Sequence, residues 1–330
     1  MAKLKINIAT WDYDRVRPIM DGRVEVEGCD VNYLPMAPEE CFHRAYFNGE
    51  FEVSEIGLSP FLIALSRGTA PYVGVPVFLS RMFRHSAIYI RTDVGINTPG
   101  DLRGKRVGVP EFQMSAAMWA RGAIQDDFGV RVDEMQWFQG GLENPGRRDK
   151  FPLNLPEHFP LSTVGDTDSL SSMLEEGRLD AVFSARAPSC FNRGAPHVTR
   201  LFPDYQVVEK EYFQRTGIFP IMHGLGVRND VHSKYPWLAS SLLKAYTKAN
   251  HIAQQDLFEV VALKIGLPWV AAHAEEARTL LGHDIWPYGV EANRKTLEAM
   301  TAYSFQQGLS TRKLAVEELF ASSTLEDTKV

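Results

Sequence analysis

The sequence has 330 residues, of which 45% are hydrophobic and 23% are charged, and its formal net charge is −6 at pH 7. This is the composition of an ordinary soluble globular protein with room for two lobes, and its acidic balance disfavours nucleic-acid binding, which needs a basic surface. No apolar run approaches the ~20 residues of a membrane-spanning helix, so no membrane partner is expected.

The N-terminal segment has the pattern of a strand and not that of an export signal. Leu4, Ile6 and Ile8 alternate with polar residues, whereas a secretory signal needs an unbroken apolar stretch of roughly 7–15 residues. We therefore expect a cytoplasmic protein. A chain from which a signal had been removed would have a similar start.

The cysteines are few and isolated. Cys29, Cys41 and Cys190 form no CxxC pair, and their number is odd. A disulfide framework or a structural zinc site would need paired or clustered cysteines. We expect three reduced, partly buried thiols and no metal site.

Strands and helices alternate through the first part of the chain. Pro38 and Glu39 suit a first helical turn, and Gly49 suits the end of that helix. Such alternation predicts an α/β fold with helices on both faces of a sheet. The expected strands are 3–9, 24–36, 51–57 and 72–79, and the expected helices are 38–48 and 60–68.

Two apolar strands in the middle of the chain are placed to connect two lobes. Residues 86–93 are predicted as a long strand that leaves the first lobe, and 217–231 as the returning crossing. Between them we expect a helix from about Ser115 to Asp127, and a helix followed by a strand within 169–185. The later chain is expected to be mostly helical, with one apolar face formed by Leu242, Tyr246, Ala249, Ala253, Leu257 and Val260.

Two crossings predict a hinged, two-lobed molecule. The first lobe would contain residues 1–92 and 223–330, and the second lobe residues 93–222. Ligands bind at such lobe interfaces, outside the carboxyl ends of strands. We expect a small-molecule cleft there.

The segment just before the first predicted crossing carries two arginines and a histidine within five residues. Arg81, Arg84, His85 and Ser86 lie within six residues. Arginine matches a carboxylate with a planar fork, and histidine transfers protons near neutral pH. The segment is a candidate anion clamp, and the alternative is a solvated basic loop at a hinge.

The second lobe contributes two further candidate groups. Glu111 ends a predicted strand, and Gln113 and Ser115 precede a helix, whose free N–H groups bind anions. Glu111 is interpreted as an acid/base group or as the salt-bridge partner of an arginine, and Ser115 as a ligand contact or a helix cap.

Residues 140–160 form a long loop rich in Gly and Pro. Its Glu143, Arg147 and Arg148 would belong to a lid or to a surface turn.

Four other positions complete the candidate site. Ser184 and Arg186 follow a predicted strand of the second lobe and should face the cleft. His223 lies in the returning strand, as a catalyst or as a core residue. Asp14 follows the first strand, as a ligand contact or a helix cap, and Tyr288, near Trp286, would supply an aromatic wall.

Several common enzyme motifs are absent, but the sequence resembles a known family. The sequence contains no P-loop, GxGxxG, HExxH or GxSxG motif. It resembles the 4,5-dihydroxyphthalate decarboxylases, bacterial enzymes of aromatic degradation that are built on the type II periplasmic-binding-protein fold. The likeness is carried by DYDRVRPIMDGRVEVEG, FEVSEIGLSPFL, VPVFLSRMFRHSAIYIR, DLRGKRVGVPEF and WPYGVEANR. Plain binding proteins share this scaffold.

The resemblance implies that one carboxylate is removed from an aromatic dicarboxylate with two ring hydroxyls, without a cofactor. The chemistry needs an acid near the reacting carbon, a base near the catechol and cations for the carboxylates. In our hypothesis His85 is the proton donor, and Glu111 or His223 holds or deprotonates the catechol. Arg84 and Arg186 bind the carboxylates, and Arg147 is a possible lid contact. The rival is a non-catalytic solute-binding protein for an aromatic or heteroaromatic acid. A homo-oligomer is compatible with the sequence, which does not decide the oligomeric state.

Overall fold

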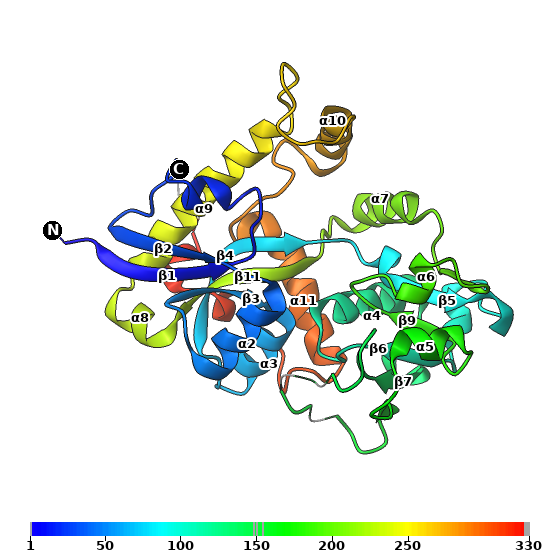
Figure 1. Cartoon of the computed structure of the whole chain (residues 1–330). Helices are drawn as coiled ribbons and strands as arrows, with labels where there is room; N and C mark the ends of the chain where they lie inside the picture. The colour runs from blue at the N-terminus through cyan, green and yellow to red at the C-terminus, as the bar shows by residue number, and fades with distance from the viewer. Residues whose placement is uncertain (1, 148, 150, 154, 327–330) are drawn as a thin grey trace.

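The computed structural model describes residues 2–147, 149, 151–153 and 155–326. Two sheets organise this part of the chain. The first has five strands in the order β2-β1-β3-β11-β4, and the second has six in the order β10-β5-β9-β6-β7-β8. Each sheet is the centre of one lobe, and the two lobes lie beside each other (Figure 1). The predicted two-lobed α/β fold is therefore confirmed.

The first lobe is built mainly from the first eighty residues. Its parallel strands β1, β2 and β3 are joined by β11, which comes from much later in the chain and runs antiparallel between β3 and β4. The strands are β1 (Leu4–Thr10), β2 (Cys29–Pro35), β3 (Val53–Gly57), β4 (Tyr72–Arg81) and β11 (Ile221–Arg228). The helices are α1 (Arg17–Met20), α2 (Pro38–Asn48), α3 (Leu58–Ser66), α8 (Asn229–Lys234) and α9 (Leu238–Asp256).

Helices cover both faces of the first sheet (Figure 1). Alternate residues of a strand point to opposite faces, so Ile56 packs in the cluster that contains α2 and α3, while Val53 packs in the cluster under α9. Helix α2 has the predicted bounds, because Pro38 suits its first turn and Gly49 ends it in the left-handed conformation, with φ of 57°.

The second lobe contains the middle of the chain. Strands β6 to β9 run parallel, and β5 pairs antiparallel with β9 and β10. The strands are β5 (Ile88–Arg91), β6 (Arg106–Val109), β7 (Gln136–Gln139), β8 (Leu161–Thr163), β9 (Ala181–Phe183) and β10 (Val198–Arg200). The helices are α4 (Ser115–Phe128), α5 (Leu170–Glu175), α6 (Ser189–Asn192) and α7 (Tyr205–Thr216).

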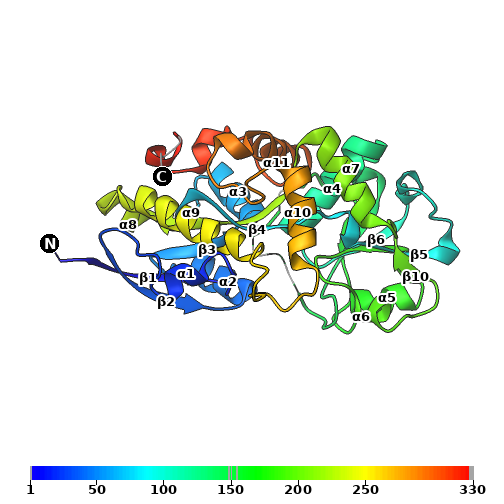
Figure 2. The ribbon, with the colours of Figure 1, turned by 90° about the horizontal axis from the view of Figure 1, so that it is seen from above.

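The C-terminal helices extend from the first lobe toward the second. Helix α11 (Arg294–Gln306) packs on both α3 and α4, and α10 (Val270–Leu281) contacts α7. Figure 2 shows α10 crossing the middle of the molecule beside α7. The short 3₁₀ helices are η1 (His85–Ala87), η2 (Thr92–Val94), η3 (Pro99–Leu102), η4 (Val132–Glu134), η5 (Glu291–Asn293), η6 (Val316–Leu319) and η7 (Ser322–Thr324).

The predicted strands 24–36 and 217–231 are shortened to β2 and β11, and two other predicted elements are also wrong in extent. The expected strand 86–93 is shortened to β5, because η1 and η2 take up its two ends. The expected apolar helical face ends early, since α9 stops at Asp256 and Val260 is 70% exposed. The strand was correct over its central residues and the helical face over its first four residues, from Leu242 to Ala253.

The state of the cysteines and the length of the helices can be stated for the described part of the chain. Cys29, Cys41 and Cys190 are free and buried, as three reduced thiols should be. Within the described ranges, no helix combines the length and the hydropathy that a bilayer-crossing segment requires.

Candidate active site

A cavity of about 560 Å³ lies between the two lobes. It is lined from the first lobe by α2, the start of α3, Arg84 and β11, and from the second lobe by residues that follow β6, β7 and β9. The cavity therefore occupies the predicted position, outside the carboxyl ends of strands. The predicted site residues that line it are Arg84, Glu111, Ser115, Arg147, Ser184, Arg186 and His223.

The other predicted residues of the cationic segment do not line the cavity. His85 is 3% exposed and packs against the rings of Phe202 and Tyr212. Arg81 is buried and donates hydrogen bonds to Asn293 and to the carbonyl of Pro287. Of the four predicted residues of this segment, only Arg84 lines the cavity.

Four more predicted residues serve local structure. Ser86 donates its backbone N–H to Glu209, and Asp14 forms a partly exposed ion pair with Arg15. Gln113 is completely buried and bonds to the backbone of residue 151. Tyr288 packs in the interior of the first lobe. Arg148 lies outside the described residues.

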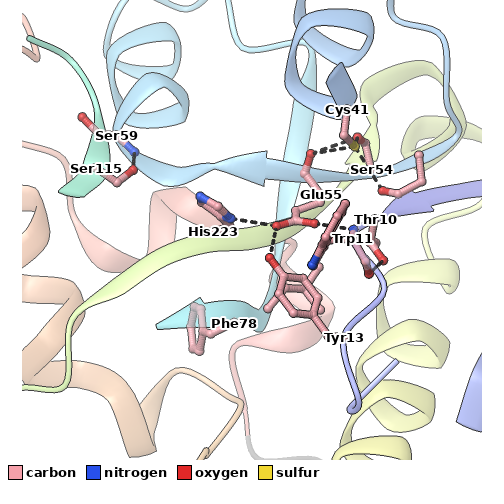
Figure 3. Close-up of polar contacts among 12 residues, drawn as sticks. Thr10, Trp11, Tyr13, Cys41, Ser54, Glu55, Ser59, Phe78, Ser115 and His223 are labelled. Carbon is pink, nitrogen blue, oxygen red and sulfur yellow. Dashed lines mark hydrogen bonds and ion pairs between the residues drawn. The ribbon is translucent and has the colours of Figure 1, made fainter. Parts of the chain in front are cut away.

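The wall of the cavity in the first lobe presents a histidine held by a buried carboxylate. His223 is on β11, and its Nδ1 atom lies 2.7 Å from Oε1 of Glu55 on β3. The side chain of Glu55 is completely buried, while that of His223 is 21% exposed. The ring of Phe42 meets the histidine ring edge-on at 4.8 Å. His223 therefore has one nitrogen fixed inside the protein and lines the cavity (Figure 3).

Glu55 accepts two further hydrogen bonds from the loop after β1. The hydroxyl of Tyr13 donates to Oε1 at 2.7 Å, and the backbone N–H of Trp11 donates to Oε2 at 2.8 Å. Burial, and then the charge of Glu55, raise the pKa of Tyr13 far above its usual value. The hydroxyl of Tyr13 therefore keeps its proton and donates a hydrogen bond to Glu55 (Figure 3).

Arg84 supplies positive charge to the cavity. Its guanidinium contacts the sulfur atoms of Met222 and Met82, and no carboxylate of the described residues lies within ion-pair distance. Burial lowers the pKa of Arg84 to about 10, against the opposing effect of Glu209, so the side chain stays cationic at neutral pH. Arg84 is partly buried, and a cation in such a place with no carboxylate partner among the described residues favours an anionic ligand.

Two helix N-termini face the same space. Gly57 and Pro60 at the start of α3 line the cavity, as do Ser115 and Ala116 at the start of α4. The N–H of Ser59 donates to Oγ of Ser115 at 3.1 Å, which joins the two lobes at this point (Figure 3). Helix N-termini carry free N–H groups and partial positive charge, so this side of the cavity suits a carboxylate.

The wall in the second lobe combines a carboxylate with an arginine. Glu111 follows β6, and its Oε1 atom lies 2.7 Å from Nη2 of Arg147. Arg147 belongs to the long loop predicted as a lid, whose residues 141–147 line the cavity. The loop turns sharply at Gly141, where any Cβ atom would meet the carbonyl oxygen of Asn144 at 1.6 Å. Glu143 anchors it by accepting two hydrogen bonds from Ser189.

Arg186, which follows β9 in the second lobe, lines the cavity where it meets helix α2 of the first lobe. It forms an ion pair with Glu39 of α2 at 2.6 Å, and the two side chains are 68% and 40% exposed. The pair connects the second lobe to the first. Because both groups are accessible to water, the pair stabilises lobe closure only weakly.

The most informative residue that the sequence analysis missed is Glu55. Its signal was a glutamate inside FEVSEIG, a strand whose residues from Val53 to Gly57 are all buried. A buried charge needs a partner, which marks the position as a functional candidate. Among residues 2–147, 149, 151–153 and 155–326, no group of three or more His, Cys, Asp and Glu could hold a metal ion.

The two-lobed sheets and the interlobe cavity define a protein of the type II periplasmic-binding-protein fold. Solved structures agree. The periplasmic aliphatic sulphonate-binding protein SsuA from Escherichia coli is 13% identical with a TM-score of 0.54, over 98% of this chain and 99% of that chain. The desulfurization enzyme DSZB is 14% identical with a TM-score of 0.50, over 98% of both chains. Both a binding protein and an enzyme therefore share this fold.

Sequence relatives identify the family within this class, although no family model matches the chain. The chain is 41% identical over 330 residues to a 4,5-dihydroxyphthalate decarboxylase of Comamonas testosteroni, covering 100% of both sequences. A 4,5-dihydroxyphthalate decarboxylase of Pseudomonas putida is 42% identical over 214 residues, which are 65% of this chain and 83% of that protein. The chain belongs to the 4,5-dihydroxyphthalate decarboxylase family.

Proposed function

We propose that this protein decarboxylates 4,5-dihydroxyphthalate to protocatechuate and CO2. Full-length identity to a decarboxylase of that substrate supports the activity. The observation that carries the site assignment is the pairing, in one cavity, of two side chains: an arginine that no carboxylate of the described residues pairs with, and a histidine held by a buried glutamate. An anion and a proton donor are what the reaction must bring together.

The proposed route protonates the ring before the carboxylate leaves. Loss of CO2 alone would leave an electron pair on an aryl carbon with nothing to delocalise it. If the ring carbon first takes a proton, the oxygen para to it supplies the electrons and stabilises the dearomatised state. Cleavage of the C–C bond then returns its electron pair to the ring and releases CO2. One proton is consumed, and no electron is gained or lost.

His223 takes the proton-donor role that the sequence suggested for His85. His223 lines the cavity, whereas the ring of His85 is enclosed by aromatic side chains. Glu111 accepts the proton of the para hydroxyl, because it is a carboxylate of the opposite wall, where the other one, Glu143, is already bonded to Ser189. General acid–base groups of this kind contribute roughly 10²–10⁴-fold to a rate.

The carboxylate that stays on the ring binds to Arg84 and the N-termini of α3 and α4. Arg147, Arg186, Ser115 and Ser184 complete the contacts with the substrate. The apolar surface of Phe42 and Met222 surrounds the carboxylate that leaves, where the loss of its charge is favoured. A cytoplasmic location and a homo-oligomeric assembly stay predictions.

The decisive experiment is incubation of the purified protein with 4,5-dihydroxyphthalate, with CO2 and protocatechuate measured separately. We expect equal amounts of both products. Tight binding of the substrate without CO2 release would overturn the proposal in favour of a binding protein. Phthalate, which lacks the hydroxyls, is the matched control and should bind without turnover, because no oxygen can supply electrons to the ring.

A further inference from the structure

We propose that Glu55 is the positioning residue of the site, which fixes the ring of His223 so that Nε2 is presented to the substrate. The proposal rests on the decarboxylation proposed above and assigns a residue that never touches the ligand. Glu55 does not line the cavity and is completely buried. It lies in the middle of β3, between β1 and β11 in the sheet.

The surroundings of Glu55 are those of an ionised carboxylate. Its two oxygens face three groups, the hydroxyl of Tyr13, the backbone N–H of Trp11 and Nδ1 of His223, at 2.7 to 2.8 Å. An ionised carboxylate only accepts hydrogen bonds, so every group around it acts as a donor. A buried charge is tolerated when it is bonded in this way.

This network determines the tautomer of His223. Since Glu55 is the acceptor, the proton lies on Nδ1, and Nε2 is the nitrogen that exchanges a proton with the substrate. In Figure 3 the second ring nitrogen points away from Glu55, on the side of Ser59 and Ser115. When both ring nitrogens carry a proton, His223 donates the one on Nε2 to the ring carbon while Nδ1 stays bonded to Glu55.

A glutamine at this position would break the arrangement without changing its shape. The amide has one acceptor oxygen and an NH2 group that only donates. It cannot satisfy Tyr13, Trp11 and His223 together, so at least one donor would face another donor. The negative charge beside the histidine ring would also be lost.

The chain offers a matched control in Glu52, three residues earlier. Its Oε2 atom accepts the backbone N–H and the side-chain amide of Asn7 on β1, both at 2.9 Å. Glu52 therefore bonds to β1 as Glu55 bonds to the loop after β1, yet it does not line the cavity and has no histidine partner among the described residues. Glu52→Gln removes a carboxylate charge from the same segment, although that charge is partly exposed and lies 3.6 Å from Arg228.

The experiment compares kcat and KM for the wild-type protein, Glu55→Gln, Glu52→Gln, His223→Gln and the double variant Glu55→Gln/His223→Gln. We expect Glu55→Gln to lower kcat about 10²-fold with KM changed less than about 3-fold, and Glu52→Gln to leave kcat unchanged. The double variant should be no slower than His223→Gln, because Glu55 acts through that ring. Additive losses in the double variant, or normal kcat in folded Glu55→Gln, would overturn the proposal.

A pH profile separates positioning from support of the fold. If His223 donates a proton, loss of the Glu55 charge should move the high-pH limb of the kcat profile to lower pH, since the imidazolium loses its proton more easily. Tyr13→Phe removes one donor but keeps the charge, and should lower kcat only a few-fold without moving that limb. A profile unchanged in Glu55→Gln contradicts the proposal. Absence of product with the wild-type protein would instead refute the proposed function.

Discussion

His85 and His223 belong to the same residue type but occupy opposite environments. His85 is 3% exposed, and neither of its ring nitrogens has a hydrogen-bond partner among the described residues. His223 is bonded through Nδ1 to a buried glutamate and lines the cavity. A histidine that transfers protons needs a partner on one nitrogen and a ligand at the other, and only His223 meets the first condition beside a ligand space.

The comparison shows why a dense cationic motif was misleading. In RMFRHS the arginines and the histidine were expected to act together, yet the backbone turns after Arg84 into a 3₁₀ helix that buries His85. His223 was the weaker candidate, since a histidine in an apolar strand is usually a core residue. The role proposed for it depends on Glu55, which lies 168 residues away in sequence.

The largest expected effect separates the two histidines directly. His223→Gln should lower kcat by about 10²–10⁴-fold, because the donor to the ring carbon is lost, while KM changes little. His85→Gln should keep kcat within about 3-fold of the wild-type value, since His85 is outside the cavity. Steady-state decarboxylation assays of both variants test the assignment. A large loss of kcat in a stably folded His85→Gln protein would reverse it.

The second expected effect concerns Arg84, the neighbour of His85 that does reach the cavity. Arg84→Ala should raise KM about 10²-fold, since a hydrogen bond to a charged group is worth roughly 1.5–3 kcal/mol. Arg84→Lys should recover part of this binding, because a single charge remains without the planar fork. Titration with substrate under non-turnover conditions measures the binding separately from the rate. Unchanged binding in Arg84→Ala would exclude it from the site.

The sequence predicted the positions of the site residues better than it predicted the residues that they contact. Strand ends and helix starts follow from local patterns, so Glu111, Ser115, Ser184 and Arg186 were placed correctly at the cavity. The contacts of Glu55 with Tyr13 and His223 join β3, the loop after β1 and β11. Those contacts depend on the insertion of β11 beside β3, which no local pattern specifies.

Arg81 and His85 were predicted at the site but do not line the cavity, and the reason is also long-range packing. Arg81, His85 and Arg84 are close in sequence, and the side to which each one points depends on the end of β4 and the turn of η1. Arg81 was expected at the ligand and is instead bound to Asn293, which is 212 residues away. Charge in a motif predicts an important position, but only the packing decides whether the charge meets a ligand or another part of the chain.

The third expected effect uses the burial of His85 as a measure of stability. Burial lowers the pKa of His85 to about 4, with a smaller opposing effect of Asp127 and a further lowering by Arg215. The unfolded chain, with a pKa near 6.5, therefore binds a proton first as the pH falls. Above about pH 6.5 the neutral, buried His85 makes its full contribution to the free energy of unfolding. As the pH falls to about 4, that contribution is lost, which lowers the free energy of unfolding by on the order of 3 kcal/mol.

Chemical denaturation at several pH values tests this prediction. The free energy of unfolding of the wild-type protein should fall between pH 7 and pH 4 by more than that of His85→Phe, which cannot take up the proton. Below about pH 4 the two should again run parallel. Identical pH dependence of the two proteins would show that His85 is not a buried neutral group.

The smallest expected effect compares the aromatic neighbours of the two histidines. Phe42 meets His223 edge-on at 4.8 Å, and Phe202 meets His85 at 5.4 Å. Both phenylalanines are nearly buried, with 7% and 8% exposure, so replacement of either by leucine should cost a similar stability of about 1 kcal/mol. Only Phe42→Leu should change the rate, lowering kcat a few-fold, because the ring of His223 loses one of the surfaces that hold it. Parallel thermal unfolding and rate measurements would decide this, and equal rates in the two variants would mean that Glu55 alone orients the histidine.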